Sequence, residues 1–420
     1  MRIAIGAVVL LVGCGFPGHV PWRGEEPFHL KVALFPWIPD EASPELARHI
    51  QSAFERAHPD ARLELVIDKT GSEAYTVPES AMDTSGWWGR PPEKGGAHLL
   101  EVDALLLKEL AERNAIRPWR DPPGQEDWLP AGAAAARVGA AIYGIPHWLC
   151  GHFVFSHSRR VQGARSASQL IAAVKQTQPP RLAGEFAGSF TVPSLYLDAY
   201  ADTHGNATVA EGLARATTAE CLDPKIPSSA RKECLDGPSV DGLRKVVAAC
   251  EDGRPRNPCL SAGDYPLCPD LPAKLFAAGQ VGAVVGYSER LYVIRSDDAN
   301  TPVLLSSAPL GSGESPLVFV DVFVLHRSCN GRCEQAAQQF VAFMNAADTH
   351  EWIQFHRDRE SGVPRYLLSA TRSAWQKLDV DPYYRTLHGL IEEARPYPNG
   401  GLVDQRKALR DLIQSSWSNP

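Results

Sequence analysis

The pattern of apolar and polar residues near the N-terminus predicts a strand, a helix and a second strand. Residues 28–37 alternate between apolar and polar side chains, as a half-buried strand does. Residues 43–60 carry apolar side chains at helical spacing, with Ser43 as the predicted N-cap and a proline at the first helical position. Residues 61–68 form the next predicted strand. This order is typical of a βαβ unit, which predicts a parallel sheet with crossover helices.

The rest of the chain alternates between predicted strands and helices, around one segment of different composition. Residues 218–270 are rich in Cys, Pro and Gly, and we interpret them as a disulfide-tied insertion rather than a core element. The elements predicted outside that segment are a buried strand and a helix at 99–119, two short strands after a turn at 141–156, a helix at 166–177, a helix, turn and apolar strand at 271–291, a buried strand at 316–326, and amphipathic helices at 333–346 and 401–417.

The composition limits the size of the fold and the kind of partner. With 420 residues, of which 44% are apolar, the chain is long enough to bury a full core and to form two domains or lobes. The net charge is -7 and no cluster of Lys or Arg stands out, whereas phosphate backbones are bound by basic surfaces. We therefore expect no nucleic acid partner, and a small or cationic ligand fits better.

The N-terminus has the form of a signal peptide. Met1 and Arg2 precede an apolar run that is too short to span a bilayer as a mature helix and that ends at Cys14. The residues LVGC resemble the lipobox of bacterial lipoproteins, which implies removal of residues 1–13, a lipid on Cys14 and a linker over 14–27. The alternative is an ordinary cleaved signal with an incidental cysteine. Both interpretations predict export to the cell envelope, the periplasm or the medium, with a membrane touched only through the anchor.

Export favours disulfides, because oxidising compartments preserve them. Cys329 and Cys333 flank an Asn-Gly turn signal, which predicts a local disulfide between them. The five cysteines from Cys221 to Cys268 are odd in number, so their pairing stays open. A zinc site is the alternative, but no CxxC pair or Cys/His spacing supports it, and we expect no metal.

An exported α/β chain with this order of elements resembles the type II periplasmic solute-binding fold, in which two lobes enclose a ligand cleft. The resemblance implies a first lobe from residues 28–138 plus about 300–345, and a second lobe from 139–299 plus about 346–420. Ligand sites in open α/β sheets lie at the carboxyl ends of strands. The segments expected at such ends are FPWIPD, EVDA, HWLC, GYSE and FVD.

A more specific resemblance lies in four segments. The chain resembles thiaminase I (thiamine pyridinylase), a secreted enzyme family on the same fold, in KVALFPWIPD (31–40), YGIPHWLCGHFVF (143–155), VVGYSERL (284–291) and PLVFVDVFVL (316–325). The family exchanges the thiazolium of thiamin for another nucleophile, through a cysteine that follows a YGIP turn and a glutamate in a GY-S/T-E segment. Cys150 and Glu289 match these two positions. The resemblance is weakest in the cysteine-rich insertion and the C-terminal tail.

A nucleophilic cysteine needs a neighbouring base or a positive field, because a thiol near its free pKa is mostly protonated at neutral pH. Glu289 would accept the proton as general base, a task that suits a partly desolvated carboxylate with a raised pKa. The resemblance implies that Cys150 bonds to the pyrimidine, that the thiazole leaves, and that an amine, thiol or other nucleophile then captures the pyrimidine. No organic cofactor is expected, and the protein is expected to be a monomer.

Carboxylates and aromatic rings are expected to hold the pyrimidine. Asp321 matches an aspartate of the family, and we interpret Asp103 as matching another; both would bind the exocyclic amine and ring nitrogens. Trp37, Tyr287 and, less strongly, Phe319 would stack on the flat ring. The family tends to have tyrosine at the positions of Trp37 and Phe319. Stacking is therefore kept here, a phenol hydrogen bond is lost, and the exact substrate stays open.

Each of these residues also has a structural interpretation. Cys150 would be a core thiol or a disulfide partner, Glu289 a surface charge in an ion pair, and Asp321 a strand-end cap. His147 is expected to hydrogen-bond within the turn, with a role in tuning the thiol as the alternative. His152, on the strand face of Cys150, is expected to be structural.

Two other functions are compatible with the same residues. One is a lipoprotein that binds thiamin or another small ligand for an ABC transporter. The other is a related enzyme that acts on a different heterocycle. The pair of Cys150 and Glu289 separates binding from catalysis, because transport alone requires neither side chain.

Overall fold

A computed structural model of the chain describes residues 26–35, 44–67, 90, 92–223, 225–226, 231–250, 270–297, 302–313, 316–355, 362–399 and 401–418. The helices and strands in chain order are β1 (Phe28–Leu34), α1 (Pro44–Ala57), β2 (Ala61–Ile67), η1 (Pro92–Lys94), β3 (Leu99–Asp103), η2 (Ala104–Leu106), α3 (Leu107–Glu112), β4 (Ile116–Arg117), η3 (Gln125–Asp127), α4 (Pro130–Ala135), β5 (Arg137–Val138), β6 (Ala141–Ile142), β7 (Gly144–Ser156), α5 (Arg159–Gln162), α6 (Ala167–Val174), β8 (Leu182–Gly184), α7 (Thr191–His204), η4 (Asn206–Thr208), α8 (Val209–Ala216), α9 (Ala219–Leu222), η5 (Lys232–Cys234), α10 (Gly237–Ala248), α12 (Leu271–Ala277), β9 (Ala283–Tyr287), α13 (Arg290–Asp297), β10 (Leu304–Ser307), β11 (Leu317–His326), α14 (Arg332–Met344), α15 (Ala347–Gln354), β12 (Leu368–Ser369), α16 (Arg372–Leu378), α17 (Pro382–Ile391), β13 (Arg395–Pro396) and α18 (Leu402–Ser418).

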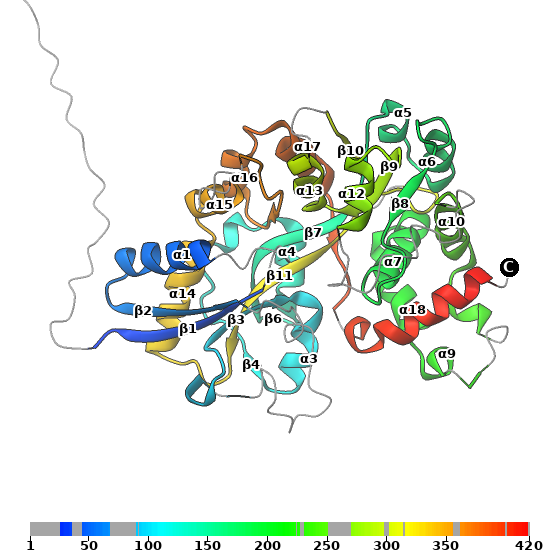
Figure 1. Cartoon of the computed structure of the whole chain (residues 1–420). Coiled ribbons are helices and arrows are strands. Elements are labelled where there is room, and N and C mark those ends of the chain that lie inside the picture. The colour runs from blue at the N-terminus through cyan, green and yellow to red at the C-terminus, as the bar shows by residue number, and fades with distance from the viewer. Residues whose placement is uncertain are drawn as a thin grey trace, which may run out of the picture.

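Two long antiparallel strands, β7 and β11, connect the two halves of the molecule (Figure 1). The main sheet has the order β2-β1-β3-β11-β7-β9-β8. On one side of the long strands lie β1, β2, α1 and α14, and on the other lie β8, β9, α6, α7 and α10 (Figure 1). Strands β1 and β2 are parallel and in register along their whole length, which confirms the predicted βαβ opening.

Buried apolar side chains form two clusters, one in the first half and one that extends across both halves. In the first half, Phe54 of α1 packs edge-on against Phe340 of α14, with ring centroids 5.4 Å apart. In the second half, Phe186, Leu195 and Val284 belong to a cluster that packs α7 and the helices around it against β8 and β9. None of the helices in the described ranges combines the length and the apolar character that a membrane span requires.

Residues 144–156 form one continuous strand, whereas two short strands after a turn were expected. The register of β7 against β11 shifts next to Asp321, which pairs with Trp148 while Val322 pairs with Pro146. His147 is thus the extra residue of a β-bulge. The bulge directly follows Pro146, and bulges are among the places where a sheet tolerates proline, so the strand continues past the residue that favoured a turn in the sequence.

The segment 218–270 is in part a core element, so the interpretation as an insertion was wrong for α10. Val240, Leu243 and Val247 lie on the inner face of α10 and are buried against α6 and α7. Their helical spacing was hidden by the Cys, Pro and Gly content around them. Cys221 and Cys234 form a disulfide ahead of this helix.

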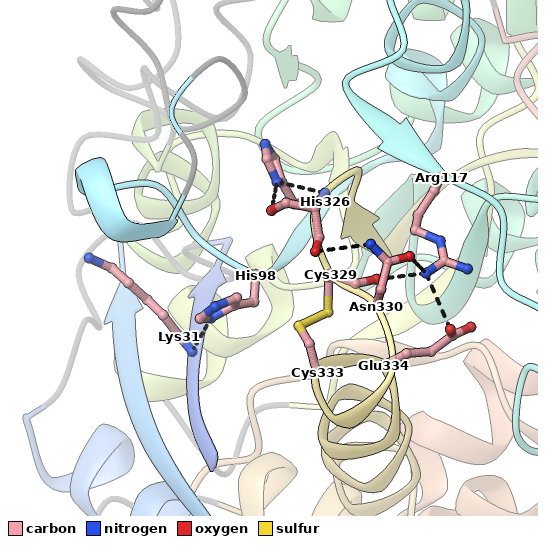
Figure 2. Close-up of a disulfide and its surroundings, with 9 residues drawn as sticks. Lys31, His98, Arg117, His326, Cys329, Asn330, Cys333 and Glu334 are labelled. Atoms are coloured by element: carbon pink, nitrogen blue, oxygen red, sulfur yellow. Dashed lines mark hydrogen bonds and ion pairs between the residues drawn. A yellow bond between two sulfur atoms is a disulfide. The ribbon is translucent and has the colours of Figure 1, made fainter.

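The predicted disulfide between Cys329 and Cys333 is confirmed (Figure 2). It joins the turn after β11 to the first turn of α14. Arg117 donates to the Cys329 carbonyl oxygen at 2.8 Å and lies 3.3 Å from the Glu334 carboxylate (Figure 2). Covalent and ionic contacts therefore fix the same corner of the fold.

Candidate active site

A cavity lies where β3, β7, β9 and β11 meet between the two halves. It encloses about 790 Å³ not occupied by protein atoms, counting the part open to solvent. Its lining residues are Phe35, Asp103, Trp148, Leu149, Cys150, Phe190, Thr191, Tyr287, Glu289, Phe319, Asp321 and Leu367.

Cys150 and Glu289 face each other in this cavity, although 139 residues separate them in the chain. Cys150 lies within β7 opposite Phe319 of β11, and Glu289 lies just after β9. The Cys150 thiol donates a hydrogen bond to Glu289 Oε2, with a sulfur–oxygen distance of 3.7 Å. Cys150 is a free cysteine, so the disulfide alternative is wrong. Glu289 lines the cavity, which also excludes a surface charge.

The electrostatic environment keeps the resting thiol protonated. Burial, and after it the carboxylates of Glu289 and Asp321, raise the pKa of Cys150 well above its ordinary value. Burial also raises the pKa of Glu289, although the nearby guanidinium of Arg290 opposes this rise. A carboxylate with a raised pKa is a better base than an exposed one, and a cation in the cavity would favour the thiolate.

Two more carboxyl groups form the floor of the cavity. Asp103, at the end of β3, and Asp321, within β11, are direct cross-strand partners. Burial raises the pKa of Asp103 to about 7. Burial, together with the charges of Glu101, Asp103 and Glu289, raises the pKa of Asp321 well above its ordinary value. Like charges opposite each other destabilise a sheet, so this arrangement favours a bound cation or shared protons.

A buried Arg290 lies behind the carboxylates. Its Nη1 donates to Asp270 Oδ1 at 2.7 Å, and its Nη2 lies 3.9 Å from Glu185 Oε1. Helix α7 begins at the cavity wall with Thr191, and the partial positive charge of a helix N-terminus favours anionic groups near it. These features partly offset the repulsion among the acidic side chains.

Aromatic side chains form the walls. Tyr287 and Phe319 lie edge to face with centroids 6.1 Å apart, and Trp148 and Phe35 also line the cavity. The predicted stacking residue Trp37 lies outside the described residues, as does the predicted lipidation site Cys14.

The structure brings six of the predicted site residues to one cavity: Asp103, Cys150, Tyr287, Glu289, Phe319 and Asp321. Site residues were expected at the carboxyl ends of strands. Cys150 and Asp321 instead lie within β7 and β11. Because β7 and β11 run from one half into the other, their middles border the cavity. The strand-end alternative for Asp321 is therefore wrong.

Several residues of the lining are not evident from the sequence. Phe190 and Thr191 lie at the start of α7, where no motif singles them out. Glu101, which lies outside the lining, was also missed: it accepts a hydrogen bond from the Phe35 amide at 3.2 Å and is hydrogen-bonded to His147 Nδ1. Burial lowers the pKa of His147 well below its ordinary value, so this contact is a hydrogen bond and not an ion pair. The signal available for Glu101 was its i, i+2 spacing from Asp103, which places the two side chains on the same face of β3. His147 thus bonds to β3, across the intervening strand β11, and not within a turn. Across the described residues, no group of three or more His, Cys, Asp or Glu side chains is placed to hold a metal ion.

Comparison with known proteins finds likenesses in structure. No protein-family profile and no curated protein matches the sequence. Thiaminase I from Bacillus thiaminolyticus aligns with a TM-score of 0.69 and 22% identity, over 92% of this chain and 98% of that chain. Clostridium botulinum thiaminase I in complex with thiamin aligns with a TM-score of 0.72 and 17% identity, over 93% and 100%.

Sugar-binding receptors align as well. The GacH receptor of Streptomyces glaucescens, known without ligand and with acarbose, has a TM-score of 0.62 and 15% identity, over 94% of this chain and 93% of that chain. At these identities the likeness concerns the fold. The chain has the two-lobed type II periplasmic-binding fold that thiaminase I and sugar-binding receptors share.

Proposed function

We propose that this protein is an exported thiaminase I-like transferase. The observation that carries the proposal is the 3.7 Å contact between the Cys150 thiol and Glu289 in a cavity with acidic and aromatic walls. A solute-binding protein requires neither a free thiol nor a base beside it. The Clostridium botulinum protein of the same fold was solved with thiamin, and a eukaryotic thiaminase-I with 3-deazathiamin, which supports thiamin as the first ligand to test.

The first half of the proposed reaction forms a Cys-bound pyrimidine. Thiamin carries a cationic thiazolium, whose charge would lower the pKa of Cys150 as it enters the acidic cavity. Glu289 takes the thiol proton, and the sulfur bonds to the pyrimidine portion. The bond between the bridging methylene and the thiazolium nitrogen breaks, and its electron pair leaves with a neutral thiazole. That leaving group needs little acid assistance.

The second half releases the pyrimidine to another nucleophile. An amine or thiol bonds to the methylene carbon and loses its proton, while the sulfur of Cys150 leaves with the electrons of its bond and is reprotonated by Glu289. Summed over both halves, thiamin and the nucleophile give a substituted pyrimidine, a neutral thiazole and one proton. Charges therefore balance without a metal or organic cofactor in any step.

The carboxyl groups and rings of the cavity orient the pyrimidine in this proposal. Asp103 and Asp321 accept hydrogen bonds from the exocyclic amine when ionised and donate to a ring nitrogen when protonated. Tyr287 and Phe319 stack on the flat ring, an arrangement worth about 0.5–1.5 kcal/mol per aromatic pair. Both kinds of contact suit a flat, cationic heterocycle.

The test is turnover of thiamin by the purified chain. Incubated with thiamin and aniline, the wild-type protein should yield the aniline adduct of the pyrimidine by mass spectrometry. Cys150→Ala should abolish the adduct, because no sulfur is present to attack, yet should still bind thiamin in calorimetry. Absence of an adduct from wild-type protein, with aniline and then with a thiol as nucleophile, would rule out this reaction.

A second candidate is a binding protein for thiamin or another small ligand, because sugar-binding receptors share the fold. Binding of thiamin by wild-type protein without any turnover would favour it. Both candidates include export, cleavage of residues 1–13 and a lipid on Cys14. Mass spectrometry of the mature N-terminus from a bacterial host, with a Cys14→Ala control, tests that part separately.

A further inference from the structure

A carboxylate outside the cavity joins two side chains that lie behind its aromatic walls. Asp198 of α7 accepts a hydrogen bond from His152 Nδ1 at 2.7 Å through Oδ2. It accepts another from the Tyr397 hydroxyl, also at 2.7 Å, through Oδ1. All three side chains are buried, and they come from β7, α7 and the segment after β13.

Each partner of Asp198 supports a different wall. The His152 ring stacks on Tyr287 with centroids 4.5 Å apart and planes 27° apart. The ring centroids of Tyr397 and Phe319 lie 4.3 Å apart. The described lining of the cavity includes Tyr287 and Phe319 but neither His152 nor Tyr397. The clamp, defined here as His152, Asp198 and Tyr397, therefore contacts the walls of the cavity through those two rings.

Burying the polar side chains of the clamp in the core costs free energy of folding, and this cost calls for an explanation. A buried carboxylate loses several kcal/mol of hydration, and apolar side chains of similar size often stabilise a core equally well or better. What the polar version adds is direction, because two charge-assisted hydrogen bonds fix the planes of both supporting rings. Rings held only by apolar contacts have no such constraint.

We propose that Asp198 is a positioning residue, which fixes the ring planes of Tyr287 and Phe319 through His152 and Tyr397. The flat heterocycle is then held at one angle to the sulfur of Cys150. This inference rests on the proposed function for its role in turnover, but the rings are fixed whether or not a ligand is present. Precise positioning by a supporting layer of hydrogen bonds is a general requirement of active sites.

The kinetic test compares Asp198→Asn and Tyr397→Phe with wild-type protein, using thiamin and aniline. Each variant should raise KM for thiamin about 5- to 10-fold, the loss expected for one misaligned ring contact, and change kcat less. The double variant should lose no more than the worse single variant, because both changes break one unit. Additive losses would contradict a shared clamp.

The matched control is Asp202→Asn, one helical turn further along α7. Asp202 is also a buried carboxylate, and its Oδ2 accepts hydrogen bonds from the amides of Leu310 and Gly311. This variant should lower Tm while leaving KM unchanged. If Asp198→Asn and Tyr397→Phe also lower Tm without raising KM more than the control does, Asp198 is merely structural and the proposal is wrong.

A second readout needs no substrate. In protein labelled with 3-fluorotyrosine, the fluorine resonance of Tyr287, assigned with Tyr287→Phe, should shift or broaden in Asp198→Asn and Tyr397→Phe but not in Asp202→Asn. This readout distinguishes failure of the proposed function from failure of the clamp. If wild-type protein does not convert thiamin but the resonance changes, the proposed function fails and the clamp stands; an unchanged resonance overturns the clamp.

Discussion

The cavity around Cys150 and the corner around the Cys329–Cys333 disulfide differ in the neighbours of their buried charged groups. At the corner, the guanidinium of Arg117 meets the Glu334 carboxylate, a backbone carbonyl and the Asn330 side chain (Figure 2). In the cavity, the carboxyl groups of Asp103 and Asp321 lie opposite each other, and burial holds the pKa of both above the ordinary value.

The difference separates two uses of polar side chains. A buried charge with a partner of opposite sign recovers at least part of its desolvation cost, so the corner needs no ligand to balance its charges. Carboxyl groups held together in a cavity destabilise the empty protein, and perturbed pKa values of this kind are typical of functional sites. The contrast therefore marks the cavity, and not the corner, as the place where a ligand is needed.

After Cys150→Ala, the largest effect is expected from Glu289→Gln. The amide cannot take the thiol proton, so kcat/KM for thiamin should fall by about 10²- to 10⁴-fold. Simple alkylation of Cys150 by iodoacetamide should be no slower, because loss of the Glu289 charge lowers the pKa of the thiol. Stopped assays of both reactions on one preparation measure the two effects. Turnover at the wild-type rate would remove Glu289 from the mechanism.

A corner variant should change stability and not activity. Arg117→Met leaves the Glu334 carboxylate mostly buried without its guanidinium, which should lower the free energy of unfolding by roughly 2–4 kcal/mol. Adding Glu334→Gln should recover part of the loss. Urea denaturation gives the energies, and kcat/KM below the midpoint should stay at the wild-type value. A strong loss of activity in folded protein would break the comparison.

Asp103→Asn should change how the stability of the folded protein depends on pH, because it removes one of the buried carboxyl groups of the cavity. Burial raises the pKa of Asp103 from 3.8 to about 7, so the folded state binds its proton more tightly than the unfolded state does. The stability of wild-type protein should therefore fall as the pH rises from about 4 to about 7, and level off above that.

The asparagine variant should lack this loss, since its side chain carries no charge and can still accept the hydrogen bond from the Leu105 amide. Its advantage should grow to about 2–4 kcal/mol at pH 7. Thermal unfolding of both proteins between pH 4 and pH 8 measures the gap. A gap that does not change with pH would show that the carboxyl group is not protonated on folding.

The sequence by itself determined the local elements and the short-range chemistry. Periodicity reports which face of a segment is buried, so β1, α1, β2 and β11 were found near their true bounds. Cys329 and Cys333 are four residues apart around a turn, so their disulfide followed from the local chain. The site residues apart from Asp103 were found because four segments resemble a known family, and Asp103 was found in the separate EVDA segment.

Only the tertiary structure decided how these residues meet. Three features depend on strand register and on how α7 packs: the bulge at His147, its hydrogen bond with Glu101, and the link from Asp198 to His152 and Tyr397. Periodicity carries no information about register between distant strands, and a buried polar side chain reads as a surface residue until its partner is known. The fold class was therefore predictable, whereas the supporting contacts of the cavity were not.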